Sequence, residues 1–254
     1  MERPKRKRTT GLVVLGLVPL LGLGLAQVAG GSSSGDVQSS AQKAIPFDDA
    51  RLKIEFNATD GDAGLQIFVD AEPWRTVTIT DPRGREVARF KSEDVIKDFG
   101  LTELFSESSE PPFDEFPFEQ FKQLFPEGRY TFSGTTIDGQ QLTSVFRFTH
   151  KVPDAPNIVT PAAESDVAPD QLVVSWDPVT SPDGVKVVAY QVLVVADEPA
   201  KGNPVRVLDV MLPADATRLP IPAEFLQPGG YKTEVLAIEN GGNQTLTEVA
   251  FTVR

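Results

Sequence analysis

The sequence predicts an all-β protein made of two tandem immunoglobulin-like β-sandwiches, the first with a short Phe-rich helical insertion. Three observations point to this fold class. Apolar and polar residues alternate in short runs, and turn-forming residues separate those runs. No segment has the pattern of a long amphipathic helix, which argues against a parallel α/β sheet. At 254 residues and 40% hydrophobic composition, the chain can build two cores of about 100 residues each.

Residues 1–26 have the pattern of a secretory signal peptide. Five basic residues precede the apolar stretch Gly11–Ala26, which ends in small residues. An uncleaved anchor is the alternative, because extending this stretch to Ala29 brings it close to the length of a membrane span. Residues 27–44 are rich in Gly and Ser, and we expect them to be a disordered linker. In both cases the rest of the chain is exported, either to the periplasm or as a secreted protein.

Composition excludes several functions. The formal charge is -12, and removing residues 1–26 leaves 19 basic and 35 acidic residues. Such acidity argues against nucleic-acid binding and against charge-driven membrane binding beyond the signal sequence. The absence of cysteine excludes disulfides, thiol nucleophiles and thiolate metal sites, and a single histidine excludes multi-histidine sites. We therefore assign no cofactor and no resident metal.

The second half, residues 151–254, has the clearer strand pattern. Leu172, Val174 and Trp176 alternate on one predicted strand, and the residues from Tyr190 to Val194 alternate on the next. Further strands are predicted at residues 205–212, 217–221, 231–239 and 245–253. Their spacing is typical of an antiparallel sandwich.

Several of these residues resemble a fibronectin type III domain over about residues 153–254. They are Trp176 in VSWDPV, Tyr190 in YQVLV, and the segment LQPGGY at residues 226–231, followed by Val235 and Ala237. The resemblance implies that the tryptophan lies in the core and that Tyr231 forms a corner, with its hydroxyl bonded to upstream backbone. It also implies a scaffold for adhesion, spacing or partner binding, without chemistry of its own.

The first half, residues 45–150, repeats one of these features. The segment LFPEGRY at residues 124–130 parallels LQPGGY, and both precede a strand, a Gly-containing turn and a final strand. Two such corners about a hundred residues apart suggest tandem sandwiches. Strands are predicted at residues 52–59, 65–70, 75–80 and 86–90, with a turn at 81–84 and a hinge at 151–156. In the last hairpin we expect Phe132 to face Phe146 and Tyr130 to face Phe148.

The insertion at residues 94–126 contains seven of the sixteen phenylalanines. Phe118, Phe121 and Phe125 recur at helical spacing, so a short helix is predicted over residues 117–125, and another around residues 101–105. One interpretation is a cap that closes one end of the sandwich. The other is a binding ledge of phenylalanines surrounded by acidic side chains.

Four further features of the sequence bear on possible sites. Asp60 and Asp62, near Asn57 and Asp70, could supply oxygen ligands to calcium, although a tight turn explains the same residues. Trp74 is either a core residue or an exposed ring that stacks on sugars. His150 stands without a nucleophile motif, so it does not indicate a catalytic triad. The segment Arg83-Gly84-Arg85 is interpreted as a turn.

The outer face of the second sandwich is unusually apolar. If Tyr190 and Tyr231 point inward, the alternation places a set of apolar residues on the opposite face. This candidate interface, to the first domain or to a partner, comprises Val187, Leu193, Val195, Leu236 and Ile238.

Together these features predict an exported, non-catalytic binding or spacer protein that contacts another protein at the bacterial cell envelope or outside the cell. A carbohydrate-binding accessory protein is the first alternative, through Trp74 or the phenylalanine ledge. A secreted hydrolase is the second, and it would require paired carboxylates in a cleft.

Overall fold

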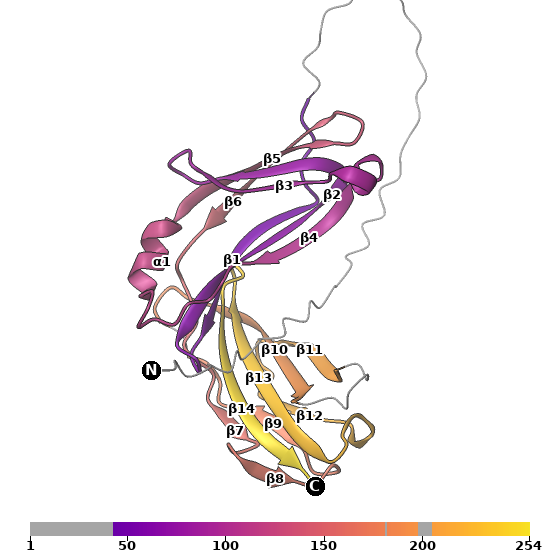
Figure 1. Cartoon of the computed structure of the whole chain (residues 1–254). Coiled ribbons are helices and arrows are strands. Elements are labelled where there is room, and N and C mark those ends of the chain that lie inside the picture. Colours follow the sequence, from indigo (N-terminus) through magenta and orange to yellow (C-terminus); the bar gives the residue numbers. More distant parts are fainter. Residues whose placement is uncertain (1–42, 181, 198–204) are drawn as a thin grey trace, which may run out of the picture.

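The computed structural model describes residues 43–180, 182–197 and 205–254, and it is an all-β protein with one short α-helix (Figure 1). The predicted signal peptide and the linker up to residue 42 lie outside the described residues. Within the described ranges, no helix is both long and apolar enough to cross a membrane. The buried apolar residues form two main cores, one in each half of the chain.

A single long strand organises the first half. Strand β2 (Asp62–Thr80) pairs in its first part with β1 (Asp49–Asn57) and β4 (Leu101–Glu107). Its second part pairs with β3 (Glu86–Lys91) and β5 (Gly128–Thr136), and β6 (Gln141–Phe148) completes this layer. The register shifts on either side of Trp74, where β2 passes from one layer to the other. The two strands predicted at residues 65–70 and 75–80 are therefore one irregular strand.

The second half packs a three-stranded sheet against five strands of a larger sheet. The small sheet contains β7 (Ile158–Thr160), β9 (Val173–Trp176) and β12 (Arg218–Pro220). The larger one has the order β11 (Val207–Pro213), β10 (Val187–Ala196), β13 (Gly229–Glu239), β14 (Gln244–Val253), with β8 (Ser165–Val167) beside β14. Trp176, Tyr190 and Tyr231 lie buried in the core between them, as expected.

Both predicted tyrosine corners are present. The Tyr231 hydroxyl accepts a hydrogen bond from the Gln227 N–H at 2.8 Å, and the Tyr130 hydroxyl donates to the Pro126 carbonyl at 3.0 Å. Each corner includes a glycine at positive φ, Gly128 at 141° and Gly229 at 146°, a conformation that other residues rarely adopt. The sequence similarity between the two segments therefore corresponds to a structural one.

The register predicted for the last hairpin of the first half is wrong. Phe132 faces Ser144, and Tyr130 faces Phe146. The connecting loop comprises residues 137–139, whereas the predicted register requires a loop at residues 138–140. Gly139, at a φ of 91°, therefore takes the last position of the loop. Because the shift equals two residues, the buried face is unchanged and Phe148 still lies in the core.

The insertion contains one predicted helix and lacks the other. Helix α1 (Phe118–Leu124) confirms the helix at residues 117–125, whereas residues 101–105 belong to β4. A 3₁₀ turn, η1 (Asp94–Asp98), precedes β4. Phe121 is buried in the first core, and Phe113, Phe116, Phe118 and Phe125 pack against it. These five rings act as a cap; Phe99, by contrast, is exposed.

The segment Arg83-Gly84-Arg85 forms the predicted turn. The buried Asp81 carboxylate accepts hydrogen bonds from the backbone N–H groups of Arg83 and Arg85, both at 2.8 Å. The Arg85 side chain also bonds to this carboxylate and to the Leu124 carbonyl, at 2.7 and 2.8 Å. The arginines therefore fasten the β2–β3 turn to the end of α1.

The two halves share one sheet. Strand β1 pairs in parallel with β14, Glu55 to Asn57 lying opposite Gln244 to Leu246, so that an eleven-stranded sheet runs through both halves. The lower end of β1 meets β14 between the two halves (Figure 1). We call this pairing the junction. It is parallel, as is the pairing of β8 with β14, whereas the other strand pairings of the described residues are antiparallel.

Candidate functional site: a carboxylate cluster at the junction

Asn243 fastens the junction to the segment between the halves. Its Oδ1 accepts a hydrogen bond from the Ile54 N–H at 2.8 Å, which extends the β1–β14 ladder by one side chain. Its Nδ2 donates to the carbonyls of Thr149 and Lys151, at 3.0 and 2.7 Å. The neighbouring Thr245 hydroxyl donates to the Pro153 carbonyl at 2.7 Å. The segment predicted to be a hinge is therefore held at several points.

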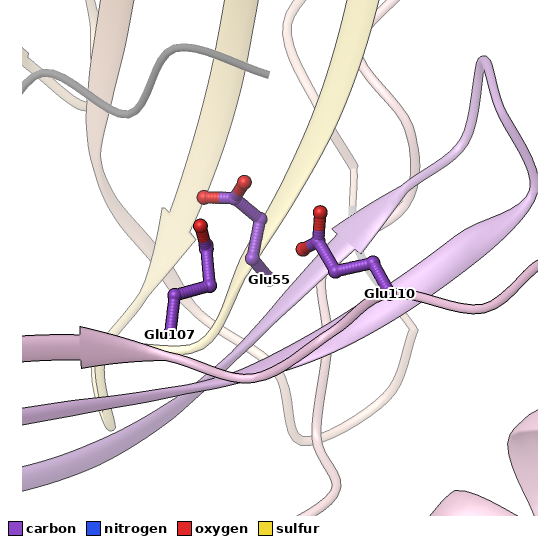
Figure 2. Close-up of side chains that lie close together, drawn as sticks. All are labelled: Glu55, Glu107 and Glu110. Atoms are coloured by element: carbon purple, nitrogen blue, oxygen red, sulfur yellow. The ribbon is translucent and has the colours of Figure 1, made fainter. Parts of the chain in front are cut away.

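Three glutamates converge beside this pairing. Glu55 lies on β1, Glu107 ends β4, and Glu110 follows β4 by three residues; each offers a carboxylate oxygen within 4.8 Å of the others (Figure 2). Their approach follows from strand register, since Gln66 of β2 faces Lys53 of β1 on one side and Glu107 on the other. We call Glu55, Glu107 and Glu110 the carboxylate cluster.

Two glutamine side chains bind this cluster. The Gln66 Nε2 donates to Glu55 Oε2 at 2.9 Å and to Glu107 Oε1 at 2.6 Å. Gln244 of β14 also donates to Glu55, so the cluster connects the two halves of the chain. The Lys53 ammonium donates to the Gln244 Oε1 at 3.2 Å. The donors that bond directly to Glu55 and Glu107 are neutral amide N–H groups, so they do not neutralise the negative charge as a cation would.

Burial makes this negative charge costly. Burial and then the carboxylates of Glu107 and Glu55 raise the pKa of Glu110 to about 8. Burial and then Glu107 raise the pKa of Glu55, although hydrogen bonds from Gln244 and Gln66 act in the opposite direction. Burial also lowers the pKa of Lys53. The site therefore favours any partner that supplies positive charge.

The predicted outer-face interface is divided by the structure. Leu193 and Leu236, each 3% exposed, form a small outer cluster with Leu246, and Val195 packs against it. Val187 instead packs against the main core, because a bulge between Val187 and Ala189 changes the face to which β10 presents its side chains. Ile238 is half-buried on β13. Partner binding by this face stays a prediction.

The loop that contains Asp60 and Asp62, which we call the aspartate loop, forms a turn. Asn57 Oδ1 accepts hydrogen bonds from the backbone N–H groups of Thr59 and Asp60 at 2.9 and 3.1 Å, and Gly61 adopts a φ of 69°. Asp70 lies at the other end of the β1–β2 pairing, opposite Asp49, and so cannot join the loop. Among the described residues, three carboxylates approach within 4.8 Å of one another in the carboxylate cluster and not in this loop.

Trp74 and His150 have structural positions. Trp74 is fully buried in the first core, and its Nε1 donates to the Thr102 carbonyl at 3.2 Å, so the core interpretation is confirmed. The His150 ring contacts the Phe125 carbonyl through Nε2 at 2.7 Å, and its backbone N–H donates to Glu127 at 2.7 Å. This histidine ties the end of β6 to the tyrosine corner.

Sequence reasoning missed the carboxylate cluster as a unit. Glu55 and Lys53 alternate with the buried Leu52 and Ile54, which is the ordinary pattern of a strand with one exposed face. What buries Glu55 is the pairing of β1 with β14, almost two hundred residues away along the chain. Nothing in the sequence around Glu55 indicates that β1 pairs with β14.

Comparisons with known proteins place few constraints on function. No protein-family model matches this sequence, and no curated protein matches it. Solved structures with some similarity include a tetra-tandem repeat from the extending region of a large adhesion protein, with 17% identity and a TM-score of 0.28. Another is the chicken CNTN1 domains FN1–FN3, with 12% identity and a TM-score of 0.29. A third is the 47-kilodalton lipoprotein of Treponema pallidum, with 16% identity and a TM-score of 0.34.

The chain spans less than two thirds of the length of each of these proteins. The alignments cover 81%, 82% and 83% of this chain, and 50%, 65% and 50% of the other chains, in the same order.

Proposed function

We propose that this protein is an exported, non-catalytic spacer that holds two β-sandwich domains, residues 45–150 and 151–254, in a fixed arrangement. The observation that carries the proposal is the β1–β14 pairing, which continues the backbone ladder from one domain into the other. A flexible tether between domains would leave these strand edges unpaired or facing solvent. Fixed geometry is useful to a protein that must present a surface at a set distance from its attachment point.

The side chains at the junction support rigidity. Asn243, Gln244 and Thr245 each bond to atoms in the first domain or in the connecting segment. The continuation Ala58 N–H to Leu246 carbonyl, at 2.9 Å, extends the ladder beyond the paired residues. Bending at the junction would break several of these buried bonds at once, each worth about 1 kcal/mol.

Small-angle X-ray scattering of the purified protein tests the spacer proposal. We expect one fixed arrangement of the two domains, as in Figure 1, to account for the scattering of residues 43–254. A profile that can be fitted only by an ensemble of widely different domain orientations would contradict the proposal.

A second, compatible function is binding of a partner protein by the far end of the first domain. Val95 is 91% and Phe99 80% exposed, and Ile96 beside them is 44% exposed. Charged residues of the same segment, together with Arg75 and Thr76 of β2 and Lys91 of β3, line a hollow of about 580 Å³. Apolar side chains with a polar rim are typical of protein contact sites.

Site-specific photocrosslinking in the native host tests this binding end. A benzoylphenylalanine at position 99 should crosslink to another protein, whereas the same group at the exposed Arg129 of β5 should not. Equal crosslinking at both positions, or none at position 99, would remove the proposal.

The alternative functions have less support in the described residues. Trp74 and Trp176 are both buried, so neither offers a ring for stacking on a sugar. The carboxylates at the junction bind glutamine amides instead of lining the hollow beside η1. We therefore favour spacing and protein contact over carbohydrate binding or hydrolysis.

A further inference from the structure

We propose that the carboxylate cluster, together with the side-chain oxygen of Gln66, binds one divalent cation of the calcium class. This goes beyond the spacer function, which requires only the β1–β14 pairing. The cation would lie where the two domains meet, because Glu55 is bonded to Gln244 of the second domain.

The arrangement of the carboxylate oxygens favours a bound cation. Three carboxylates approach within 4.8 Å of one another from β1, the end of β4 and the segment after it (Figure 2). Glu55 is only 8% exposed, so water screens its charge poorly. Like charges at this distance repel unless a cation or protons compensate them.

A buried oxygen without a partner belongs to the side chain that bonds to two of the carboxylates. Gln66 is 1% exposed, and its amide lies between Glu55 and Glu107, to which Nε2 donates. Its Oε1 is buried and has no hydrogen-bond partner among the described residues. Leaving such an acceptor unpaired costs about 1–3 kcal/mol. Rotation of the amide by half a turn would direct this oxygen toward a cation between the two carboxylates, and bonds to the cation would then replace the two hydrogen bonds from Nε2.

Two more acceptors near this position are also unpaired. Glu110 Oε1 and Asp62 Oδ1 are buried without hydrogen-bond partners in the described part of the chain. The ideal Cβ position on Gly64 lies 2.5 Å from Glu110 Oε1, so a side chain at residue 64 would displace this carboxylate. Glycine at this point therefore leaves room for Glu110 to lie over the strand. The site has more acceptors than donors, which is the composition that a cation requires.

The ligand types select the ion. Carboxylate and amide oxygens suit calcium and magnesium, whereas the zinc and copper sites of proteins use histidine or cysteine. Calcium takes six to eight oxygens in variable geometry, and magnesium requires a near-ideal octahedron. Three carboxylates, each able to bind through two oxygens, and the Gln66 oxygen match the calcium requirement better. The high pKa of Glu110 has the same origin, the excess of buried negative charge.

This site is separate from the aspartate loop, whose residues the sequence offers as possible calcium ligands. Asp60 is exposed, and one of its oxygens accepts a hydrogen bond from the Asn57 side chain at 3.2 Å. A substitution in the loop and a substitution in the cluster therefore separate the two possibilities.

Isothermal titration of calcium chloride and magnesium chloride into chelator-treated protein tests the proposal, at about pH 8.5, where most carboxyls are ionised. We expect one calcium per chain, with a dissociation constant on the order of 10⁻⁴ M, and binding of magnesium at least about tenfold weaker. E110Q should weaken calcium binding at least about tenfold, and D60N should leave it unchanged.

Glu110 Oε1 makes no hydrogen bond, so E110Q is expected to fold, and its melting curve without calcium verifies this. No calcium binding by the wild-type protein at several millimolar would overturn the inference, because the weakest extracellular calcium modules saturate in about that range. Equal loss in D60N and E110Q would also overturn it. Scattering without calcium decides the spacer proposal separately.

Discussion

Replacing Asn243 by alanine is expected to cost about 3 kcal/mol or more and to loosen the two domains from one another. The substitution leaves the Ile54 N–H and the carbonyls of Thr149 and Lys151 without their partner. The Ile54 N–H is buried, and leaving it unpaired costs about 1–3 kcal/mol, to which the loss of the two part-buried bonds to the carbonyls adds. Chemical denaturation measures the loss, and scattering measures the loosening.

Asn240 supplies the matched control. It lies three residues away in the same β13–β14 connection, its side chain is exposed, and its backbone bond to Lys186 does not depend on the side chain. The free energy of unfolding of N240A should lie within about 0.5 kcal/mol of the wild-type value, as is usual for surface substitutions. If N243A and N240A had the same stability and the same scattering, the junction would not depend on Asn243.

Replacing Trp74 by alanine is expected to destabilise the first domain by about 3–5 kcal/mol. The ring is fully buried at the point where β2 passes between the layers, and its loss leaves a large cavity and an unpaired Thr102 carbonyl. Thermal unfolding followed by circular dichroism measures the effect without relying on tryptophan fluorescence.

Trp74→Phe is the graded control, because it retains an apolar ring and removes only the indole nitrogen and part of the volume. We expect its loss to be clearly smaller than that of W74A. If W74A were as stable as the wild-type protein but had lost binding to a glycan, the side chain would serve recognition and its buried position would be incorrect.

The parts of the fold that sequence predicts are those set by local pattern. Alternation identified the strand residues around Trp176 and Tyr190. The resemblance of LQPGGY to a fibronectin type III corner, and the parallel segment LFPEGRY, predicted both tyrosine corners. Helical spacing of phenylalanines identified α1. In each case neighbouring residues determine the structure, so that a short window contains the information.

The wrong predictions concern residues whose structure depends on pairing with distant segments of the chain. Residues 101–105 satisfy a helical spacing as well as a strand, and pairing with β2 selects the strand. The bulge between Val187 and Ala189 and the register shifts on either side of Trp74 change which face a side chain occupies, and alternation alone cannot place them.

The carboxylate cluster depends on two pairings at once. The β1–β2–β4 register brings Gln66 beside Glu107, and the β1–β14 pairing brings Gln244 beside Glu55. The second of these joins residues 189 positions apart. Loop closure over such a distance leaves no periodic trace in sequence, so the site becomes visible only in three dimensions.

The distance between two spin labels, one on each domain, tests the fixed junction most directly. The chain contains no cysteine, so cysteines introduced at the exposed Thr143 of β6 and Arg218 of β12 can be labelled without a background. We predict one narrow distance distribution in the wild-type protein, and a broader one when N243A is added. A wild-type distribution as broad as that of two domains on a flexible tether would contradict the account.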